Sequence, residues 1–220
     1  MKPGEVLGVL GRTGSGKTSL TRLIVRFYDV SKGSILLDGL DVRQFQLATL
    51  RQRVAMVTQD VQLFEGTIRD NITFFNPTIA DQQIIHVLET LELDEWFKVL
   101  PDGLDTHLTS GGRNLSAGQA QLLAFVRVFL RNPGLVILDE ASSRLDIVTE
   151  QRIATAIDKL LNQCTGVIIA HRLQAIQRAD QLLILENGRV IEYGSRIELS
   201  RDPNSYFYKL LQAGNEAIRE

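Results

Sequence analysis

The sequence predicts an α/β fold with a mainly parallel sheet core, a small antiparallel β part and an inserted helical subdomain. Short β-branched runs alternate with helical patterns at both ends of the chain, as is typical of a parallel sheet buried on both faces. Between about residues 60 and 130, the apolar positions keep a helical period instead. The chain has 220 residues, so we expect one domain over residues 1–220.

The first strand is predicted at 5–10, and a glycine-rich turn leads from it into a helix. The apolar positions of this helix are Leu20, Leu23, Ile24 and Phe27. Two further strands are predicted at 35–37 and 54–58 from their apolar and β-branched residues.

Helical periods follow at 78–97 and at 116–131, and the second ends at Asn132 and Pro133. Alternation then resumes, with a strand at 135–138, a helix at 150–161 and a strand at 167–170. Asn187 and Gly188 lie between two apolar runs, which is a strong hairpin signal.

Composition excludes several classes of protein. Apolar residues make up 44% and charged residues 23%, with a net charge of −2, which is typical of a soluble globular protein. The basic residues are scattered, so no nucleic-acid partner is expected. No apolar run approaches the roughly 20 residues of a membrane span, and no secretory signal is visible, so we expect a cytoplasmic site of action. The single cysteine, Cys164, excludes an internal disulfide.

The stretch GRTGSGKT fits the pattern GxxxxGK[ST] and lies between a predicted strand and a predicted helix. Its backbone N–H groups can surround phosphate oxygens, Lys17 can reach the outer phosphates, and the Thr18 hydroxyl can bind Mg²⁺. This context predicts a P-loop NTPase. The expected nucleotide contacts are Gly11, Arg12, Thr13, Gly14, Ser15, Gly16, Lys17, Thr18 and Ser19.

Polar residues follow three other predicted strands. The run LVILDE ends in Asp139 and Glu140, Gln59 follows the strand at 54–58, and His171 follows the strand at 167–170. Taken alone, each is more often a solvated turn or a satisfied structural residue. Because ligands of open α/β sheets bind at the carboxyl ends of the strands, their common location favours a site for phosphoryl transfer. Asp139 is then placed to hold Mg²⁺ and Glu140 to polarise a water molecule.

The stretch NLSAGQ precedes a long amphipathic helix, and Ser116 with Gln119 forms the capping-box pattern. An ordinary helix cap and a second anion site are both open interpretations here.

With these motifs together, nearly the whole chain resembles the nucleotide-binding domains of ABC transporters. The matching motifs are GRTGSGKT (Walker A), Gln59 (Q-loop), LSAGQ (signature), LVILDE (Walker B), Ser143 to Asp146 (D-loop) and His171 (switch histidine). The stretches RFYDVSKGSILLDG, VTQDVQLFEGTIRDNI and AHRL are most similar to exporter-type members, in which a transmembrane domain precedes this one.

The resemblance implies a head-to-tail dimer of two such domains, identical or related, that share ATP and Mg²⁺. Ser116 and Gly118 of one domain would close on the γ-phosphate held by the other, with Gln119 and Asp146 nearby. Glu140 would be the general base, His171 would hold the γ-phosphate and the attacking water, and Gln59, Thr18 and Asp139 would hold Mg²⁺.

The family also implies a transmembrane partner and a location at the cytoplasmic face of the membrane. The helical lobe, including Phe64 and residues near Trp96, would supply the groove for a coupling helix.

The sequence departs from the family pattern in several places. The ten residues before Gly11 lack the aromatic residue that stacks on adenine, so the N-terminal adenine-stacking segment is expected to be missing. The stretch THLTSGG at 106–112 replaces an acidic, arginine-containing one. Ala117 replaces a glycine of the signature, and Arg144 replaces a small residue of the D-loop.

Glu140, His171 and LSAGQ together favour an ATPase that powers transport. One alternative is an ATP-dependent dimerisation module with little hydrolysis, which the missing aromatic favours. Another is a soluble ABC ATPase acting on DNA or ribosomes, but such proteins usually carry paired cassettes or long coiled coils, which are not visible here. A P-loop kinase would lack LSAGQ.

Overall fold

The computed structural model describes residues 1–58, 60–112, 114–139, 146–170, 173 and 175–216. The chain divides into two compact units. Unit 1 comprises Met1–Ala55, Gly134–Glu140 and Cys164–Glu220, and unit 2 comprises Met56–Pro133 and Ala141–Gln163.

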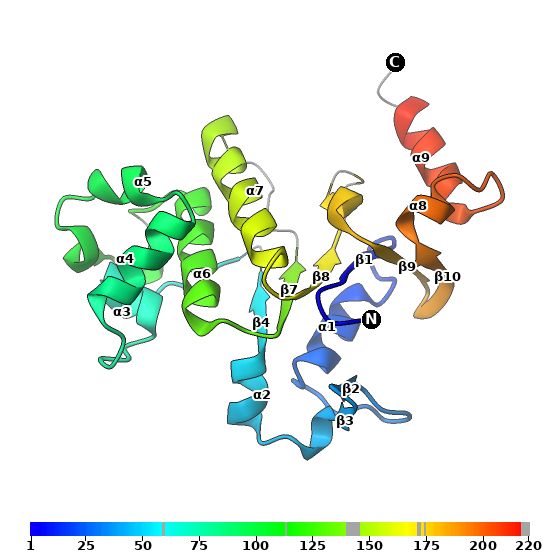
Figure 1. Cartoon of the computed structure of the whole chain (residues 1–220), viewed down its shortest axis with the longest axis horizontal. Helices are drawn as coiled ribbons and strands as arrows, with labels where there is room; N and C mark the ends of the chain where they lie inside the picture. The colour runs from blue at the N-terminus through cyan, green and yellow to red at the C-terminus, as the bar shows by residue number, and fades with distance from the viewer. Residues whose placement is uncertain (59, 113, 140–145, 171–172, 174, 217–220) are drawn as a thin grey trace. The chain divides into compact units, whose positions relative to one another are not determined.

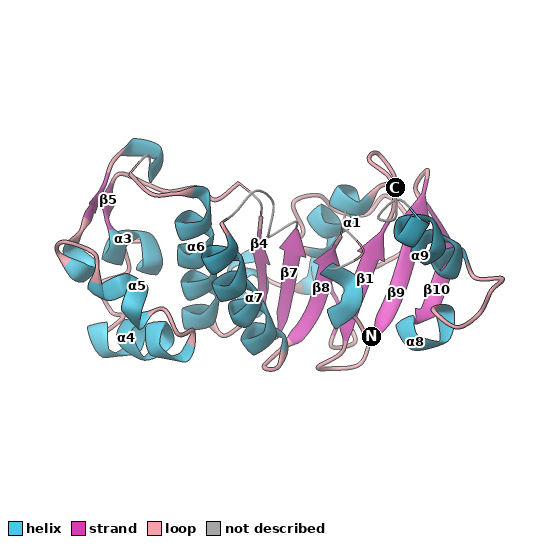
Figure 2. Ribbon diagram, turned by 90° about the horizontal axis from the view of Figure 1, so that it is seen from above, coloured by secondary structure: helices cyan, strands magenta, loops and turns pink. Residues whose placement is uncertain are grey.

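A six-stranded sheet is the centre of the α/β part, and Figure 2 shows its strands side by side. In spatial order its strands are β10 (Arg189–Ser195), β9 (Gln181–Glu186), β1 (Val6–Leu10), β8 (Thr165–Ile169), β7 (Leu135–Asp139) and β4 (Val54–Val57). β1 pairs in parallel with β8 and β9, and β7 pairs in parallel with β8. β10 pairs antiparallel with β9. A mainly parallel core with an antiparallel part was predicted, and this prediction is confirmed.

The inner strands β1, β7 and β8 are apolar along most of their length and largely buried, whereas the edge strand β10 is largely exposed. Val9, Val136, Ile137 and Leu182 are fully buried, although neighbours along a strand point to opposite faces. The β9–β10 hairpin turns at Asn187 and Gly188, both with positive φ, as the Asn-Gly pair predicts.

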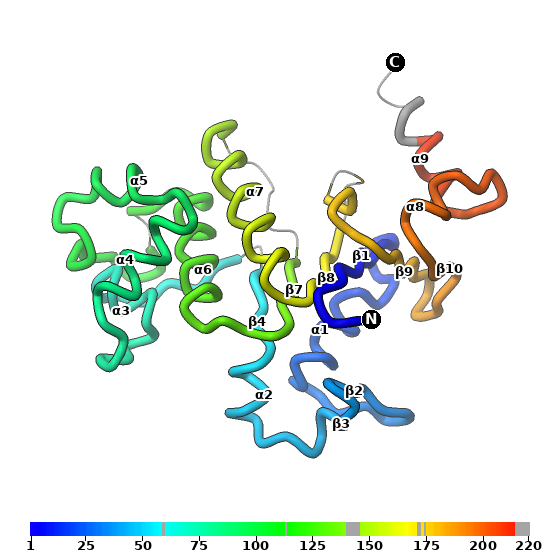
Figure 3. Tube along the Cα trace, in the orientation of Figure 1, coloured from blue at the N-terminus to red at the C-terminus, as the bar shows by residue number. Residues whose placement is uncertain are grey.

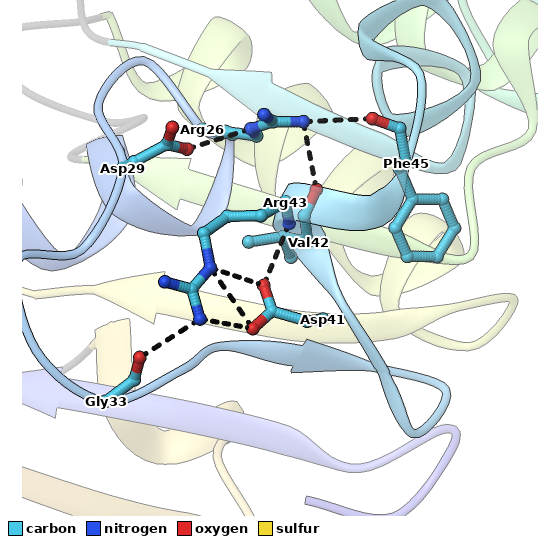
Figure 4. A network of polar contacts seen from close by, with 7 residues as sticks. All are labelled: Arg26, Asp29, Gly33, Asp41, Val42, Arg43 and Phe45. Atoms are coloured by element: carbon cyan, nitrogen blue, oxygen red, sulfur yellow. Dashed lines mark hydrogen bonds and ion pairs between the residues drawn. The ribbon is translucent and has the colours of Figure 1, made fainter.

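Helix α1 (Lys17–Ile24) follows β1 and is shorter than the apolar spacing predicts, since Phe27 lies beyond its end. The chain turns at Arg26, whose φ is 55°. The Phe27 N–H donates to the Arg22 carbonyl oxygen (2.8 Å) and the Arg26 N–H to that of Leu23 (3.1 Å), which closes the last turn of the helix. The Arg26 guanidinium also donates to the carbonyl oxygens of Val42 (3.2 Å) and Phe45 (2.9 Å), as Figure 4 shows.

A small antiparallel hairpin follows, made of β2 (Leu36–Leu37) and β3 (Leu40–Asp41). After it, Arg43 donates to both carboxylate oxygens of Asp41, with Nη2–Oδ2 at 2.6 Å (Figure 4). These hydrogen bonds lower the pKa of Asp41 to about 2.

The remaining helical segments of unit 1 are the 3₁₀ turns η1 (Val42–Gln44) and η4 (Ala175–Arg178) and the helices α2 (Leu47–Arg53), α8 (Arg196–Leu199) and α9 (Tyr206–Glu216). Figure 3 shows α8 and α9 following β10 towards the C-terminus. The Glu192 carboxylate accepts from the backbone N–H groups of Tyr206 and Phe207, both at 2.9 Å. Glu192 thus caps α9 from the neighbouring strand β10.

Unit 2 is mainly helical (Figure 1). Its elements are β5 (Gly66–Thr67), α3 (Ile68–Thr73), α4 (Asp81–Thr90), α5 (Asp94–Lys98), η2 (Gly103–Asp105), β6 (His107–Leu108), η3 (Ser110–Gly112), α6 (Ala117–Arg131) and α7 (Ile147–Leu161). α6 packs against α3, α4 and α7. The fully buried side chains between these helices are Ile68, Ile84, Leu88, Leu122, Leu123, Phe125 and Ile153.

The helical period at 78–97 corresponds to two helices rather than one. The chain reverses at Glu92, whose φ is 57°, while Leu91 and Leu93 on either side are fully buried. Helix α6, in contrast, begins after Ser116 and ends at Asn132, as its sequence signals predict.

Candidate functional site

The loop between β1 and α1, here called the phosphate loop (residues 11–16), contains three glycines with positive φ. At Gly11 (φ 153°), an added Cβ would overlap the carbonyl oxygen of Leu185 and Oγ of Ser15, so only glycine fits. Gly16 adopts a left-handed conformation (φ 105°) as the N-cap residue of α1. The pattern of glycines therefore sets the local backbone.

Helix α1 begins without a side-chain cap among the described residues. Its first-turn N–H groups have no acceptor within the helix, and its first turn contains no acidic residue. The uncapped N–H groups and the helix dipole together form a site that attracts an anion. Lys17, Thr18 and Ser19 supply this first turn.

Lys17 is buried and its side chain folds back onto the phosphate loop. Its Nζ donates to the carbonyl oxygens of Gly11 (2.5 Å) and Arg12 (3.1 Å). The ammonium group thus lies on the phosphate loop itself.

Ser15 has a buried hydroxyl inside the same loop. Only 4% of the residue is exposed, and its Oγ has no hydrogen-bond partner among the described residues. Because a buried polar atom left unpaired costs about 1–3 kcal/mol, a phosphate oxygen near this hydroxyl would remove a penalty. The loop therefore fits a phosphate group.

The β9–β10 hairpin supports the phosphate loop. The Gly188 N–H donates to the carbonyl oxygen of Ser15 at 3.0 Å. A Cβ added at Gly16 would be in van der Waals contact with the Gly188 Cα, at 3.6 Å. The sequence predicts the hairpin but not its contact with the phosphate loop. The glycines at 16 and 188 are the only residues that could have indicated it.

Asp139 ends strand β7 at the same edge of the sheet. It is in register with Ile169 of β8, which is in register with Val9 of β1, two residues before Gly11. Asp139 and the exposed Thr18 offer oxygen ligands of the kind that Mg²⁺ prefers. Within the described ranges, no group of three or more His, Cys, Asp or Glu side chains is placed to hold a metal ion.

The signature residues lie in unit 2, at the start of α6. Ser116 Oγ accepts from the Gln119 N–H (3.2 Å), and Gln119 Oε1 accepts from the Ser116 N–H (2.9 Å), so the predicted capping box is present. Ser116 is exposed and Gly118 is buried. Ala117 is the first residue of the helix.

Asp146, also in unit 2, caps helix α7. Its Oδ1 accepts from the Thr149 N–H at 3.0 Å, and the hydrogen bonds from the Thr149 side chain and backbone lower the pKa of Asp146. The expected site residues Gln59, Glu140 and His171 lie outside the described residues, as do Ser143 and Arg144 of the D-loop.

Three phenylalanines form an exposed aromatic cluster on unit 2: Phe64 (45% exposed), Phe74 (51%) and Phe75 (53%). The Phe64 ring centroid lies 6.3 Å from that of Phe74 and 6.0 Å from that of Phe75. Phe64 was predicted as part of a partner-binding surface, but Phe74 and Phe75 were not. Two adjacent aromatic residues directly before Asn76 and Pro77 could have indicated them. The Trp96 ring is buried.

No helix within the described ranges has the length and apolar character needed to cross a bilayer.

A buried strand, a glycine loop with positive φ and an uncapped helix carrying a buried lysine define a P-loop phosphate-binding protein. The family model described as ABC transporter matches residues 1–143, so the chain belongs to the ABC transporter family.

Relatives of known sequence agree. The chain is 44% identical over 203 residues to the uncharacterised ABC transporter ATP-binding protein YfiC of Bacillus subtilis, covering 92% of this chain and 34% of the relative. It is 42% identical to the putative multidrug export ATP-binding/permease protein YgaD of the same organism, covering 92% of this chain and 35% of the relative. It is 40% identical to an ATP-dependent lipid A-core flippase of Methylobacillus flagellatus, covering 90% of this chain and 34% of the relative.

The structure is similar to that of a bacterial Atm1-family ABC exporter with ATP bound. The TM-score is 0.86 and the identity 32%, covering 96% of this chain and 37% of that one. The chain therefore spans about a third of the length of the relatives it matches. It corresponds to the ATP-binding domain of the family.

Proposed function

We propose that the chain is the ATP-hydrolysing domain of an ABC exporter and that it powers transport by closing head-to-tail on a second such domain. The observation that carries this proposal is the position of Lys17, whose ammonium lies on the carbonyls of Gly11 and Arg12 beside the uncapped start of α1. This arrangement supports binding of the outer phosphates of a nucleotide.

Mg²⁺ would be held by Thr18, Asp139 and Gln59. When bound, the ion neutralises charge that develops on the phosphates. The first-turn amides of α1 and the Ser15 hydroxyl would orient the phosphates. The shared sheet edge of Asp139 and the phosphate loop supports this assignment.

Hydrolysis would use Glu140 as the general base and His171 as the residue that holds the γ-phosphate and the attacking water. Glu140 directly follows Asp139, and His171 comes two residues after Ile169, which is in register with Asp139. A positioned base is typically worth about 10²- to 10⁴-fold in rate.

The second domain, identical or related, would contribute Ser116, Gly118, Gln119 and Asp146 to the nucleotide. The exposed, capped start of α6 supports this because it presents a helix N-terminus on the surface of unit 2. The name of one relative, a putative multidrug export ATP-binding/permease protein, supports a transmembrane partner. We expect this partner to dock on Phe64 and its neighbours. The domain would then work at the cytoplasmic face of a membrane.

The test is the rate of Mg²⁺-dependent ATP hydrolysis as a function of protein concentration, with Glu140→Gln as the blank. Activity per molecule should rise with concentration, because two domains form each site, and vanish in Glu140→Gln. ATP binding without turnover above the blank would refute the catalytic role and leave an ATP-dependent dimerisation module.

A further inference from the structure

Arg127 lies in the middle of α6, and its half-buried guanidinium binds three acceptors. Nε donates to the Asn71 carbonyl oxygen (2.7 Å), Nη1 to the Gln62 carbonyl oxygen (2.9 Å) and Nη2 to Asn71 Oδ1 (3.2 Å). Gln62 and Asn71 belong to the segment that precedes and forms α3, so one side chain fixes this segment onto α6.

All three acceptors are neutral. No carboxylate in the described part of the chain forms an ion pair with Arg127, and burial alone lowers its pKa to about 10. An apolar side chain in its place would leave these oxygens without their donors, so the guanidinium is needed for its fork of hydrogen bonds rather than for its volume.

Asn71 connects Arg127 to Phe64 through hydrogen bonds. Asn71 is 0% exposed, and its side-chain amide binds both backbone groups of Phe64: Oδ1 accepts from the N–H (2.8 Å) and Nδ2 donates to the carbonyl oxygen (2.9 Å). The backbone position of Phe64 thus depends on an amide that Arg127 also holds.

The guanidinium also contacts the aromatic cluster directly. Its Cζ lies 4.7 Å from the centroid of the Phe74 ring, a cation–π contact, and this ring packs edge-on against Phe64. Arg127 therefore reaches two of the three exposed phenylalanines, one through Asn71 and one through the ring face.

The other end of the same helix carries the signature. Ser116 caps α6, and Arg127 follows eleven residues later, which is roughly 16 Å along the axis. Leu122, Leu123 and Phe125 between them are fully buried, so α6 has packed neighbours along its length and responds to a push as a rigid body.

We propose that Arg127 is a positioning residue that links the exposed aromatic cluster to the signature end of α6. This inference rests on the proposed function: a transmembrane partner that packs on Phe64, Phe74 and Phe75 displaces their rings, Arg127 moves with them, and α6 shifts Ser116 towards or away from the nucleotide of the second domain.

The experiment compares kcat and KM for ATP in the chain alone and in the transporter assembled with its transmembrane domain. The kcat of the assembled transporter divided by the kcat of the chain alone measures the effect of the partner, and it requires no known transported compound. In Arg127→Met this ratio should differ from the wild-type ratio by about three- to tenfold, in the direction of one. The KM for ATP should stay within about twofold of the wild-type value. Arg127→Lys, which keeps the charge but not the fork of donors, should recover part of the ratio.

The matched control is Arg131→Met, one turn later on the same helix. Arg131 is exposed and makes no side-chain hydrogen bond to any described residue, so the ratio should stay at the wild-type value. Phe74→Leu, which keeps an apolar side chain but removes the ring face, should move the ratio part of the way towards one and is less disruptive to folding than Arg127→Met.

Equal losses of kcat in both forms, with an unchanged ratio, would show that Arg127 only stabilises the fold and would overturn the inference. A wild-type ratio of one would also overturn it, because no partner effect would exist to transmit, yet ATP hydrolysis by the chain would remain. Absence of hydrolysis in both wild-type forms would instead refute the proposed function.

Discussion

The N–H of Gly188 donates a 3.0 Å hydrogen bond to the carbonyl oxygen of Ser15. The turn of the β9–β10 hairpin thus braces the phosphate loop from a part of the chain that carries no nucleotide motif. A preorganised loop binds with less loss of conformational freedom, so we expect the hairpin to contribute to ATP affinity.

Gly188→Ala tests this brace. Gly188 has a left-handed backbone (φ 76°), which alanine adopts at a cost of roughly 1 kcal/mol. The substitution should therefore lower the free energy of unfolding by that amount and displace the turn from Ser15. Calorimetric titration should show ATP affinity reduced about three- to tenfold. Gly39→Ala is the control, because Gly39 has φ 78° and equally open surroundings but lies in the β2–β3 turn. Equal affinity losses in both variants would contradict the brace.

Gly11→Ala should abolish nucleotide binding. Its Cβ would overlap the Leu185 carbonyl oxygen and Ser15 Oγ, and such overpacking costs about 1–3 kcal/mol and shifts the loop. Gly14→Ala, with φ 82° and open space around the position, should retain weakened binding of a fluorescent ATP analogue. Stronger impairment by Gly14→Ala than by Gly11→Ala would show that the close approach to Leu185 is unimportant.

Ser116→Ala should separate helix capping from dimerisation. Loss of the cap should lower the free energy of unfolding by about 1 kcal/mol, and so should Thr67→Ala at the capping box of α3. Only Ser116→Ala should impair ATP-driven dimer formation, measured by light scattering in a Glu140→Gln background. Normal dimer formation by Ser116→Ala would remove Ser116 from the proposed interface.

Asp41 should make stability depend on pH in the acid range. Hydrogen bonds from Arg43 lower its pKa from 3.8 to about 2 in the folded chain. Its stabilising effect is therefore complete above the ordinary pKa and is lost as pH falls towards 2. In urea unfolding, the difference in free energy of unfolding between wild type and Asp41→Asn should be constant from about pH 7 to 5 and shrink below about pH 4.

Arg43→Met provides the control for this prediction. In its background, Asp41→Asn should change the stability less at neutral pH, because the side-chain donors are gone and only the backbone N–H of residue 43 still donates to Asp41. A difference between Asp41→Asn and wild type that grows on acidification would contradict the assignment.

The sequence could predict features that are encoded within a few residues. The phosphate loop, the capping box of α6 and the Asn-Gly hairpin each depend on local backbone preferences, and each is present. The helix after the phosphate loop was predicted too long, because it ends in a left-handed turn at Arg26, where no glycine or asparagine signals the end.

Features that depend on distant pairing could not be predicted. The contact between Gly188 and Ser15 exists because β9 pairs with β1, with Leu7 opposite Gln181. Glu92 reverses the chain between α4 and α5 without glycine or proline, because Leu91 and Leu93 both enter the core of unit 2. No local pattern signals either choice.

The position of β1 in the sheet has a consequence for synthesis on the ribosome. Its neighbours are β8 and β9, which begin at Thr165 and Gln181, so β1 waits unpaired while most of the chain is made. Pairings this distant in sequence form slowly and leave apolar strands open to aggregation or to chaperones. The strand that leads into the phosphate loop therefore gains its neighbours in the sheet only after β8 and β9 have been synthesised.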